Sequence, residues 1–185
     1  MKKILLLALF YFPLSGFSQI DTASTSFPIK DNKVVYELIL ESKDTKQSEI
    51  YVAAKKWISD RFTSTKSVIQ SEDASYGQII GKGKSIIWSI GTNGKQELGY
   101  ELSFSIQIDA KDNKFRIRFY DIQKNNMAVG VIPADSMDIL HFQSAQLKKK
   151  NNEKWYRLVK YTNNYFYSMA IDFANTVYKS KSDTF

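Results

Sequence analysis

The sequence lacks cysteine and has a single histidine, His141, among its 185 residues. Without cysteine the chain has no disulfide bonds, no thiolate zinc site and no thiol nucleophile. One histidine excludes a metal site that needs two, and the Gly-x-Ser-x-Gly elbow of serine hydrolases is absent. His141 lies in DILHFQ beside apolar residues, a setting typical of a structural histidine. The sequence therefore predicts no cofactor and no metal site, and it disfavours an enzyme.

The sequence also lacks an apolar run long enough to span a bilayer, which takes about 20 residues. Its longest such run, Ile4–Leu14, covers eleven residues and follows two lysines near the N-terminus. Gly16-Phe17-Ser18 then places small residues at the positions that a signal peptidase reads. These features predict a cleaved signal peptide over residues 1–18. The mature protein is expected to start near Gln19 and to reside in the periplasm or outside the cell.

The rest of the chain suits one domain, expected over residues 27–180 between a flexible polar leader (19–26) and a short tail (181–185). An aromatic content of 14% supplies material for its core. An exported domain without disulfides is more typical of bacteria than of the animal secretory route.

Apolar spacing predicts a strand and then a helix at the start of the domain. Residues 34–41 alternate as a strand does, with the even-numbered side chains on a buried face. Ser48 is a suitable N-cap for the helix, which is expected to end near Phe62. Apolar residues recur in it at spacings of three and four, so one side should pack on the core. These residues are Ile50, Ala54, Trp57, Ile58 and Phe62.

Three longer strands are expected next, over residues 78–90, 98–108 and 115–122. In the second, six apolar side chains share one parity and none lies on the other, which is typical of a strand with one solvated face. Turn signals at residues 92–94 and 111–113 predict hairpins between these neighbours.

A last helix is expected over residues 152–180, after an irregular segment at residues 125–138. Whether residues 139–151 form a separate helix stays open. The order of strand, helix, three or more strands and helix predicts an α+β fold. In this fold the helices cover one face of an antiparallel sheet.

The segment GQIIGKGKS, residues 77–85, has the composition of a phosphate loop but neither the spacing nor the context. A phosphate loop needs glycine five residues before its Gly-Lys-Ser, and that position holds Gln78. β-branched residues follow Ser85, where a phosphate loop would open a helix. The segment is therefore predicted to be a strand. Its glycines at 81 and 83 face the core and let a helix pack closely, while the lysines at 82 and 84 face away.

Four segments lie in an order that resembles a known family. They are FPI…DNKVVYELILE (27–41), YVAAKKWISDRF (51–62), GQIIGKGK (77–84) and FSIQIDAKDNKFRIRFYDI (104–122). Together they resemble an exported Bacteroidetes family of unknown function with a TBP-like fold, domain of unknown function 4468. The resemblance implies a curved antiparallel sheet with helices on one face. It implies no catalytic residues, because the family has none assigned.

The sheet face that points away from the helices is the candidate functional surface. Cations beside an aromatic ring suit an anionic partner. The sequence thus favours a non-catalytic binding domain of the bacterial envelope, whose partner is a protein or an anionic glycan or lipid. Nucleic acid is not expected, because the chain is predicted to be exported and a fold does not carry its function with it. The residues predicted to form the patch are Lys82, Lys84, Arg116, Arg118 and Tyr120.

Three alternatives stay open. The face can be an ordinary solvated surface. A carboxylate-dependent hydrolase would need a pocket that gathers Glu97, Glu101 or Asp121, although the pairs Glu37–Glu41 and Glu97–Glu101 are expected on solvated faces. An anionic membrane surface or glycan can also bind the basic sheet face or the C-terminal helix. The basic residues in and before that helix are Lys148, Lys149, Lys150, Lys154, Arg157 and Lys160.

Overall fold

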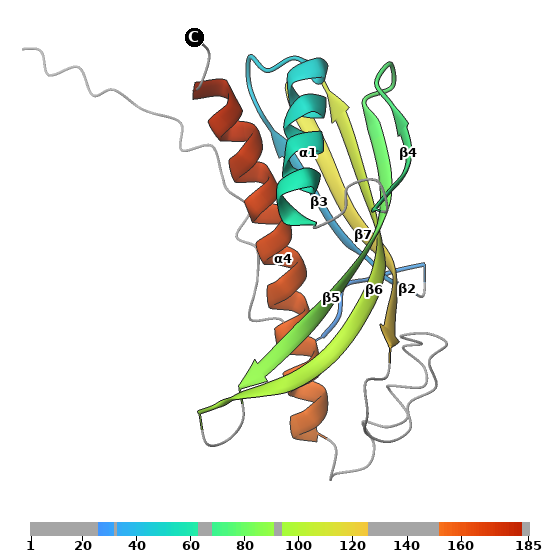
Figure 1. Ribbon diagram of the computed structural model, residues 1–185, viewed down its shortest axis with the longest axis vertical. Coiled ribbons are helices and arrows are strands. Elements are labelled where there is room, and N and C mark those ends of the chain that lie inside the picture. The colour runs from blue at the N-terminus through green and yellow to red at the C-terminus, as the bar shows by residue number, and fades with distance from the viewer. Residues whose placement is uncertain (1–25, 32, 63–67, 91–93, 126–151, 183–185) are drawn as a thin grey trace, which may run out of the picture.

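The computed structural model describes residues 26–31, 33–62, 68–90, 94–125 and 152–182, which form strands and two helices (Figure 1). The strands are β1 (Ile29–Lys30), β2 (Lys33–Val34), β3 (Tyr36–Glu41), β4 (Ile69–Asp73), β5 (Gln78–Ile90), β6 (Gln96–Lys111) and β7 (Lys114–Asn125). The helices are α1 (Gln47–Arg61) and α4 (Asn152–Ser182).

Five strands form one antiparallel sheet in the order β3-β7-β6-β5-β4, and β1 pairs with β2 in a separate small hairpin. Both helices lie on the same side of the sheet (Figure 1). The α+β fold with helices on one face is therefore confirmed. We call the helix-covered side the inner face and the opposite side the outer face.

The alternation in β6 decides which of its side chains enter the core. Leu102, Phe104, Ile106 and Ile108 are buried on the inner face, whereas Ser103, Gln107 and Asp109 alternate with them. The strand is longer than expected at both ends and pairs along its length with β5 and β7. The assignment of inner and outer residues from the sequence is confirmed where the side chains are described.

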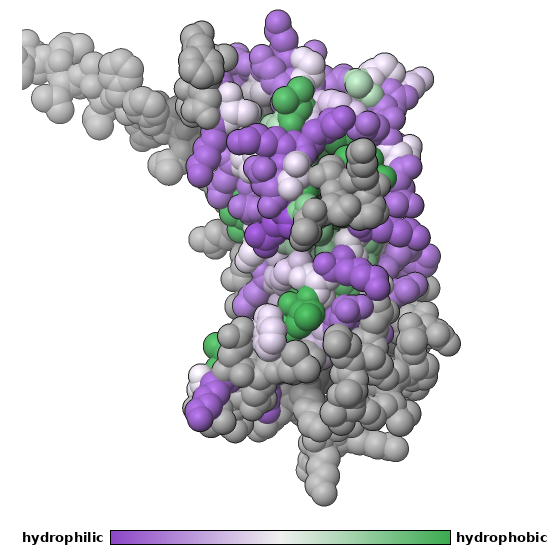
Figure 2. All heavy atoms as spheres, in the orientation of Figure 1, coloured by the Kyte–Doolittle hydropathy of each residue, from purple (hydrophilic) through white to green (hydrophobic). Residues whose placement is uncertain are grey.

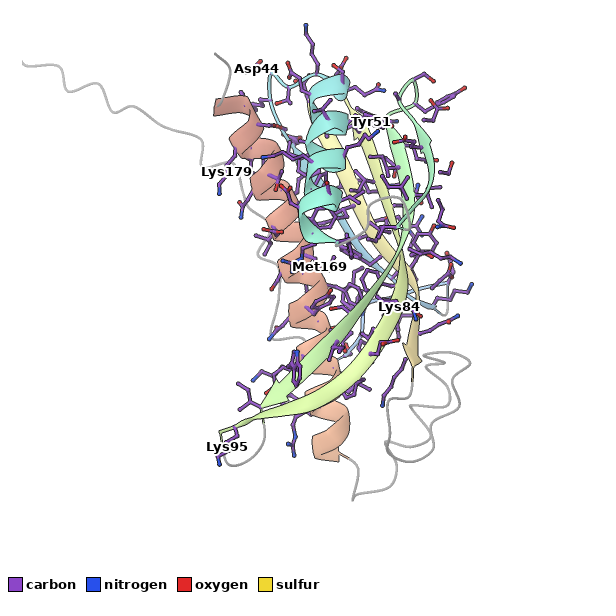
Figure 3. The ribbon with its side chains drawn as sticks, viewed as in Figure 1. Asp44, Tyr51, Lys84, Lys95, Met169 and Lys179 are labelled. Carbon is purple, nitrogen blue, oxygen red and sulfur yellow. The ribbon has the colours of Figure 1, made fainter. Side chains whose placement is uncertain are left out.

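Helix α4 covers the sheet because one stripe of it, from Val159 to Val177, is mostly apolar and buried. Figure 3 shows side chains filling the space between this helix and the sheet, where Met169 lies. The ring of Phe166 contacts Phe104 and Phe119, with centroids 5.0 and 5.1 Å apart. The fully buried members of the stripe are Val159, Thr162, Phe166, Met169, Phe173 and Val177.

One buried and one partly buried hydrogen bond fix the position of α4 against its neighbours. The hydroxyl of Tyr36 in β3 donates to Oδ1 of Asn163 over 2.6 Å, and burial raises the pKa of this tyrosine. In α1, Nε1 of Trp57 donates to Oδ2 of Asp172 over 2.9 Å. Both bonds join α4 to segments more than 100 residues earlier.

The glycines of β5 face the core, as predicted, but their nearest neighbours do not belong to α1 or α4. A Cβ atom at Gly83 would lie 2.7 Å from the ring of Phe104 and 3.1 Å from the ring of Phe62. A Cβ atom at Gly81 would lie 2.9 Å from the carbonyl oxygen of Val68. Glycine is required here because aromatic rings and a neighbouring backbone segment occupy the space of a side chain.

The prediction that Ser48 caps α1 is wrong, because the helix starts earlier and Lys46 is its N-cap. The amide of Gln47 donates to Oδ1 of Asp112 over 2.8 Å, and the amide of Lys46 donates to Oε2 of Glu49 over 3.0 Å. Asp112 lies in the β6–β7 turn, so a distant carboxylate satisfies the first turn of the helix. Local sequence alone does not contain this partner.

Strand β4 was not predicted from the sequence, since its residues IQSED are polar and mostly exposed. It pairs with the start of β5 and is joined to α1 through Glu72, which accepts from Tyr51 and Lys55 over 3.1 and 3.3 Å. Several other expectations lie outside the described residues. They concern residues 125–138 beyond Asn125, the segment 139–151 with His141 and the three basic residues at 148–150, and most of the turn at 92–94.

Candidate binding surface

All five residues of the predicted patch lie on the outer face. Lys82 of β5 pairs with Ser105 of β6, and Ser105 pairs in turn with Tyr120 of β7. Because side chains alternate along a strand, Lys84 and Arg118 point to the same side as these residues. Arg116 lies one step further along β7. The register thus gathers three strands into the surface that the sequence predicted.

Carboxylates from neighbouring strands lie between the cations of β7. Arg116 contacts Asp109 of β6 over 2.9 Å and Glu37 of β3 over 3.6 Å. Nε of Arg118 lies 3.3 Å from Oε2 of Glu37, although the two groups are not aligned as a hydrogen bond. The guanidinium of Arg118 also lies 5.3 Å from the ring centre of Tyr120. This half of the patch is a charge network and not a bare cluster of cations.

The lysines of β5 are more open than the arginines. Figure 3 shows Lys84 on β5, and its Nζ lies 3.5 Å from Oε1 of Glu101 while 70% of its side chain stays exposed. Lys82 is exposed and makes no ion pair among the described residues. Between these lysines and β7 run the short side chains of Ser103 and Ser105. The lysines therefore carry the accessible positive charge of this surface.

Asp109 is the most constrained acid of the outer face. Burial alone would raise its pKa, but hydrogen bonds from Gln78, Gln107 and Arg116 and the charge of Arg116 outweigh this effect and lower it. The donors lie 2.8 to 3.1 Å from the carboxylate oxygens. Asp109 thus stays ionised and links three strands through its hydrogen bonds. An ionised carboxylate has no proton to donate at neutral pH, so Asp109 is poorly suited to act as a general acid.

The acids of the hydrolase alternative do not converge where they are described. Glu101 of β6 pairs with Lys84, and Asp121 of β7 is exposed at a backbone φ of 49°. The side chain of Glu97 lies outside the described set. Among the described residues no group of three acidic or histidine side chains is placed to hold a metal ion.

Exposed apolar residues border the patch, and sequence reasoning did not assign them a role. Ile39 of β3 is 63% exposed, and Trp88 of β5 is 47% exposed next to a β-bulge. Ile86 is exposed on the outer face between Lys84 and this bulge. The alternating pattern of β3 contained a signal for Ile39, since the odd-numbered residues were placed opposite the core.

Comparison with known proteins agrees with this architecture. Residues 36–125 match the family model of a domain of unknown function (DUF4468) with TBP-like fold. The chain resembles the DUF4468 family. The sequence patterns predicted this resemblance, and the match spans β3 to β7, the whole five-stranded sheet with α1.

Two solved structures share this DUF4468-like fold. The crystal structure of a DUF4468 family protein from Bacteroides ovatus ATCC 8483 has a TM-score of 0.61 at 17% identity, over 85% of this chain and 91% of that one. The crystal structure of a TBP-like protein from Parabacteroides distasonis ATCC 8503 has a TM-score of 0.58 at 16% identity, over 81% and 96%. No curated protein matches the chain. Similarity at this level shows the fold and not the ligand.

Proposed function

We propose that this protein is an exported, non-catalytic binding domain of the bacterial envelope that engages its partner through the outer face of the sheet. One observation carries the proposal: both described helices pack on the inner face, whereas among the described elements only the β1–β2 hairpin reaches the charged surface on the other side, where Lys30 lies 3.2 Å from Glu37. The apolar N-terminal run with its preceding lysines supports export.

The geometry favours a protein partner over an anionic polymer. Arg116 and Arg118 already face Glu37 and Asp109, so much of their charge is compensated before any partner arrives. Such alternation of both signs suits a partner surface that also carries both signs. Trp88 and Ile39 at the border supply the kind of exposed apolar and aromatic groups that anchor protein interfaces.

The side that holds the helices is a poorer candidate for this role. Figure 2 shows one face of the molecule, where the described surface around α1 is mostly hydrophilic, with separate small apolar spots. The apolar stripe of α4 is buried in the core and is not available to a membrane surface. Among the described segments, no helix combines the length and apolar character needed to cross a membrane.

The proposal is tested by charge reversal on the accessible lysines. We expect Lys82→Glu/Lys84→Glu to weaken capture of a specific envelope partner by roughly tenfold or more, because each reversal at a real contact costs on the order of 1 kcal/mol. The control is Lys56→Glu/Lys160→Glu, which makes the same change of charge at exposed positions on the two helices. Partners are identified and quantified by mass spectrometry of pull-downs from envelope extract.

The pull-down separates the binding surface from the rest of the molecule. Equal capture by wild type and by the Lys82/Lys84 variant would remove the outer face from consideration. Export is tested on its own by the intact mass of the native protein, which should begin at Gln19. Recovery of a chain that starts at Met1 from the cytosol would contradict export.

A further inference from the structure

The end of β7 places a lysine on the inner face of the sheet. Phe115, Ile117 and Phe119 point inward, but the pairing with β6 shifts between Ser103 and Ser105, so β7 carries one extra residue there. Beyond this bulge the parity is reversed. Lys124 therefore pairs with the fully buried Leu102 and lies on the core side.

Lys124 is half-buried in an environment without a compensating carboxylate. Its Nζ lies 4.7 Å from the ring centre of Tyr100, and no acid among the described residues pairs with it. Desolvation lowers the pKa of its ammonium group. A partly desolvated ammonium that has no acidic partner among the described residues is costly, and a ring face offsets only part of this cost. An anion at this position would offset the remainder.

Further polar groups from other elements surround the same spot. Burial raises the pKa of Tyr100 to about 12, with Tyr161 of α4 as a further cause, and the charge of Arg157 acts in the opposite direction. The hydroxyl of Tyr161 accepts the backbone amide of Ile90 over 3.1 Å, which holds the end of β5 against α4. Lys124 of β7 thus lies over the ring of Tyr100, and Arg157 of α4 is close enough to act on the same tyrosine through its charge.

We propose that Lys124, Tyr100, Tyr161 and Arg157 form a binding site for a single carboxylate or phosphate group at the junction of α4 with the ends of β5, β6 and β7. The lysine and arginine supply charge, and the tyrosine hydroxyls donate hydrogen bonds to the anionic oxygens. The fully buried Leu102, which is the cross-strand partner of Lys124, limits access of water, which strengthens these contacts. The site lies on the inner side of the sheet and is separate from the outer face.

The test is a titration with inorganic phosphate and, separately, with acetate, against chloride at matched ionic strength. We expect NMR signals of Tyr100, Lys124 and Tyr161 to shift and saturate with one of the two anions, which identifies the preferred group. Lys124→Gln should raise the dissociation constant about tenfold or more, and Lys124→Arg should retain binding. Lys56→Gln is the matched control, because it removes an exposed lysine of α1 outside both proposed binding surfaces, and it should leave the titration unchanged.

Each result decides the proposal. Shifts that are absent for both anions, or that are equal in wild type and Lys124→Gln, would overturn it. If Lys124→Gln does not fold, the wild-type titration decides alone: saturating shifts at Tyr100 and Tyr161 support the site, and shifts confined to exposed lysines contradict it. Loss of partner capture by the Lys82/Lys84 variant has no bearing on this outcome, so the two proposals fail separately.

Discussion

The two faces of the sheet are made by the same strands and differ in what their side chains meet. On the inner face, Phe104 and Phe119 contact Phe166 of α4 and have no access to water. On the outer face, the residues that alternate with them form ion pairs across three strands and stay partly exposed. Stability should therefore depend on the inner face, and the outer face should tolerate change and be available for binding.

The largest difference between the two faces is expected when a charge is placed on each face of β6 in turn. Phe104→Asp should unfold the protein, because a carboxylate in an apolar core costs several kcal/mol against a total stability of about 5–15 kcal/mol. Ser103→Asp is the matched control on the adjacent outer position, where Lys84 of β5 is its cross-strand partner. Thermal melts followed by circular dichroism compare the two, and a cooperative melt for Phe104→Asp near the wild-type temperature would refute the inner assignment.

A smaller loss of stability is expected when a side chain is added at Gly83, where the inner face has no space for it. Gly83→Val should lower the free energy of unfolding by about 1–3 kcal/mol, since the new side chain meets the rings of Phe104 and Phe62. Lys84→Val adds the same side chain to the next residue on the outer face and should change stability much less. Urea titrations measure the free energy of unfolding of both variants. If both lose the same amount of stability, the rings of Phe104 and Phe62 move to make room for the new side chain at position 83.

Removing one buried hydroxyl tests the link between β3 and α4. Tyr36→Phe deletes the hydrogen bond to Asn163 and should cost about 0.5–1.5 kcal/mol, the usual net value of such a bond. Tyr76→Phe removes a hydroxyl from a side chain that is 80% exposed and should be neutral. Chemical denaturation gives the difference, and a neutral Tyr36→Phe would show that the bond adds little to the packing of the ring.

The outer network should contribute least, and its contribution should depend on pH. The pKa of Asp109 is lowered from 3.8 in the folded protein, so its stabilisation is present above that value and lost as the pH falls through the folded pKa. Asp109→Asn should cost up to about 1 kcal/mol at pH 7. The gap in stability between the variant and wild type should narrow as the pH falls below 3.8, the unfolded pKa.

Denaturation at pH 7, 5 and 3 follows this gap. The control is Asp60→Asn, an exposed acid of α1 with no ion pair among the described residues, which should show little difference at any pH. A gap for Asp109→Asn that stays constant with pH would indicate a loss of hydrogen bonds to the side chain and no role for its charge.

Where the apolar pattern repeats, the sequence alone was sufficient. The parity of β6, the helical stripe of α4 and the inward direction of Gly83 follow from which side chains avoid water, and this preference belongs to each residue. The five patch residues were placed on one face for the same reason. The resemblance to the DUF4468 family rests on these repeated patterns and is confirmed over residues 36–125.

Only the tertiary structure decided features that depend on partners distant in sequence. Helix α1 begins at Gln47, because the carboxylate of Asp112, in a turn 65 residues later, accepts the hydrogen bond of the Gln47 amide. Glu37 and Asp109 reach Arg116 and Arg118 only once β3, β6 and β7 are paired, so a predicted cationic patch became a charge network. The bulge near Asp121 reversed the parity of β7 and carried Lys124 to the inner face. A side chain's preference for water predicts its face, but the register between strands determines which charges meet.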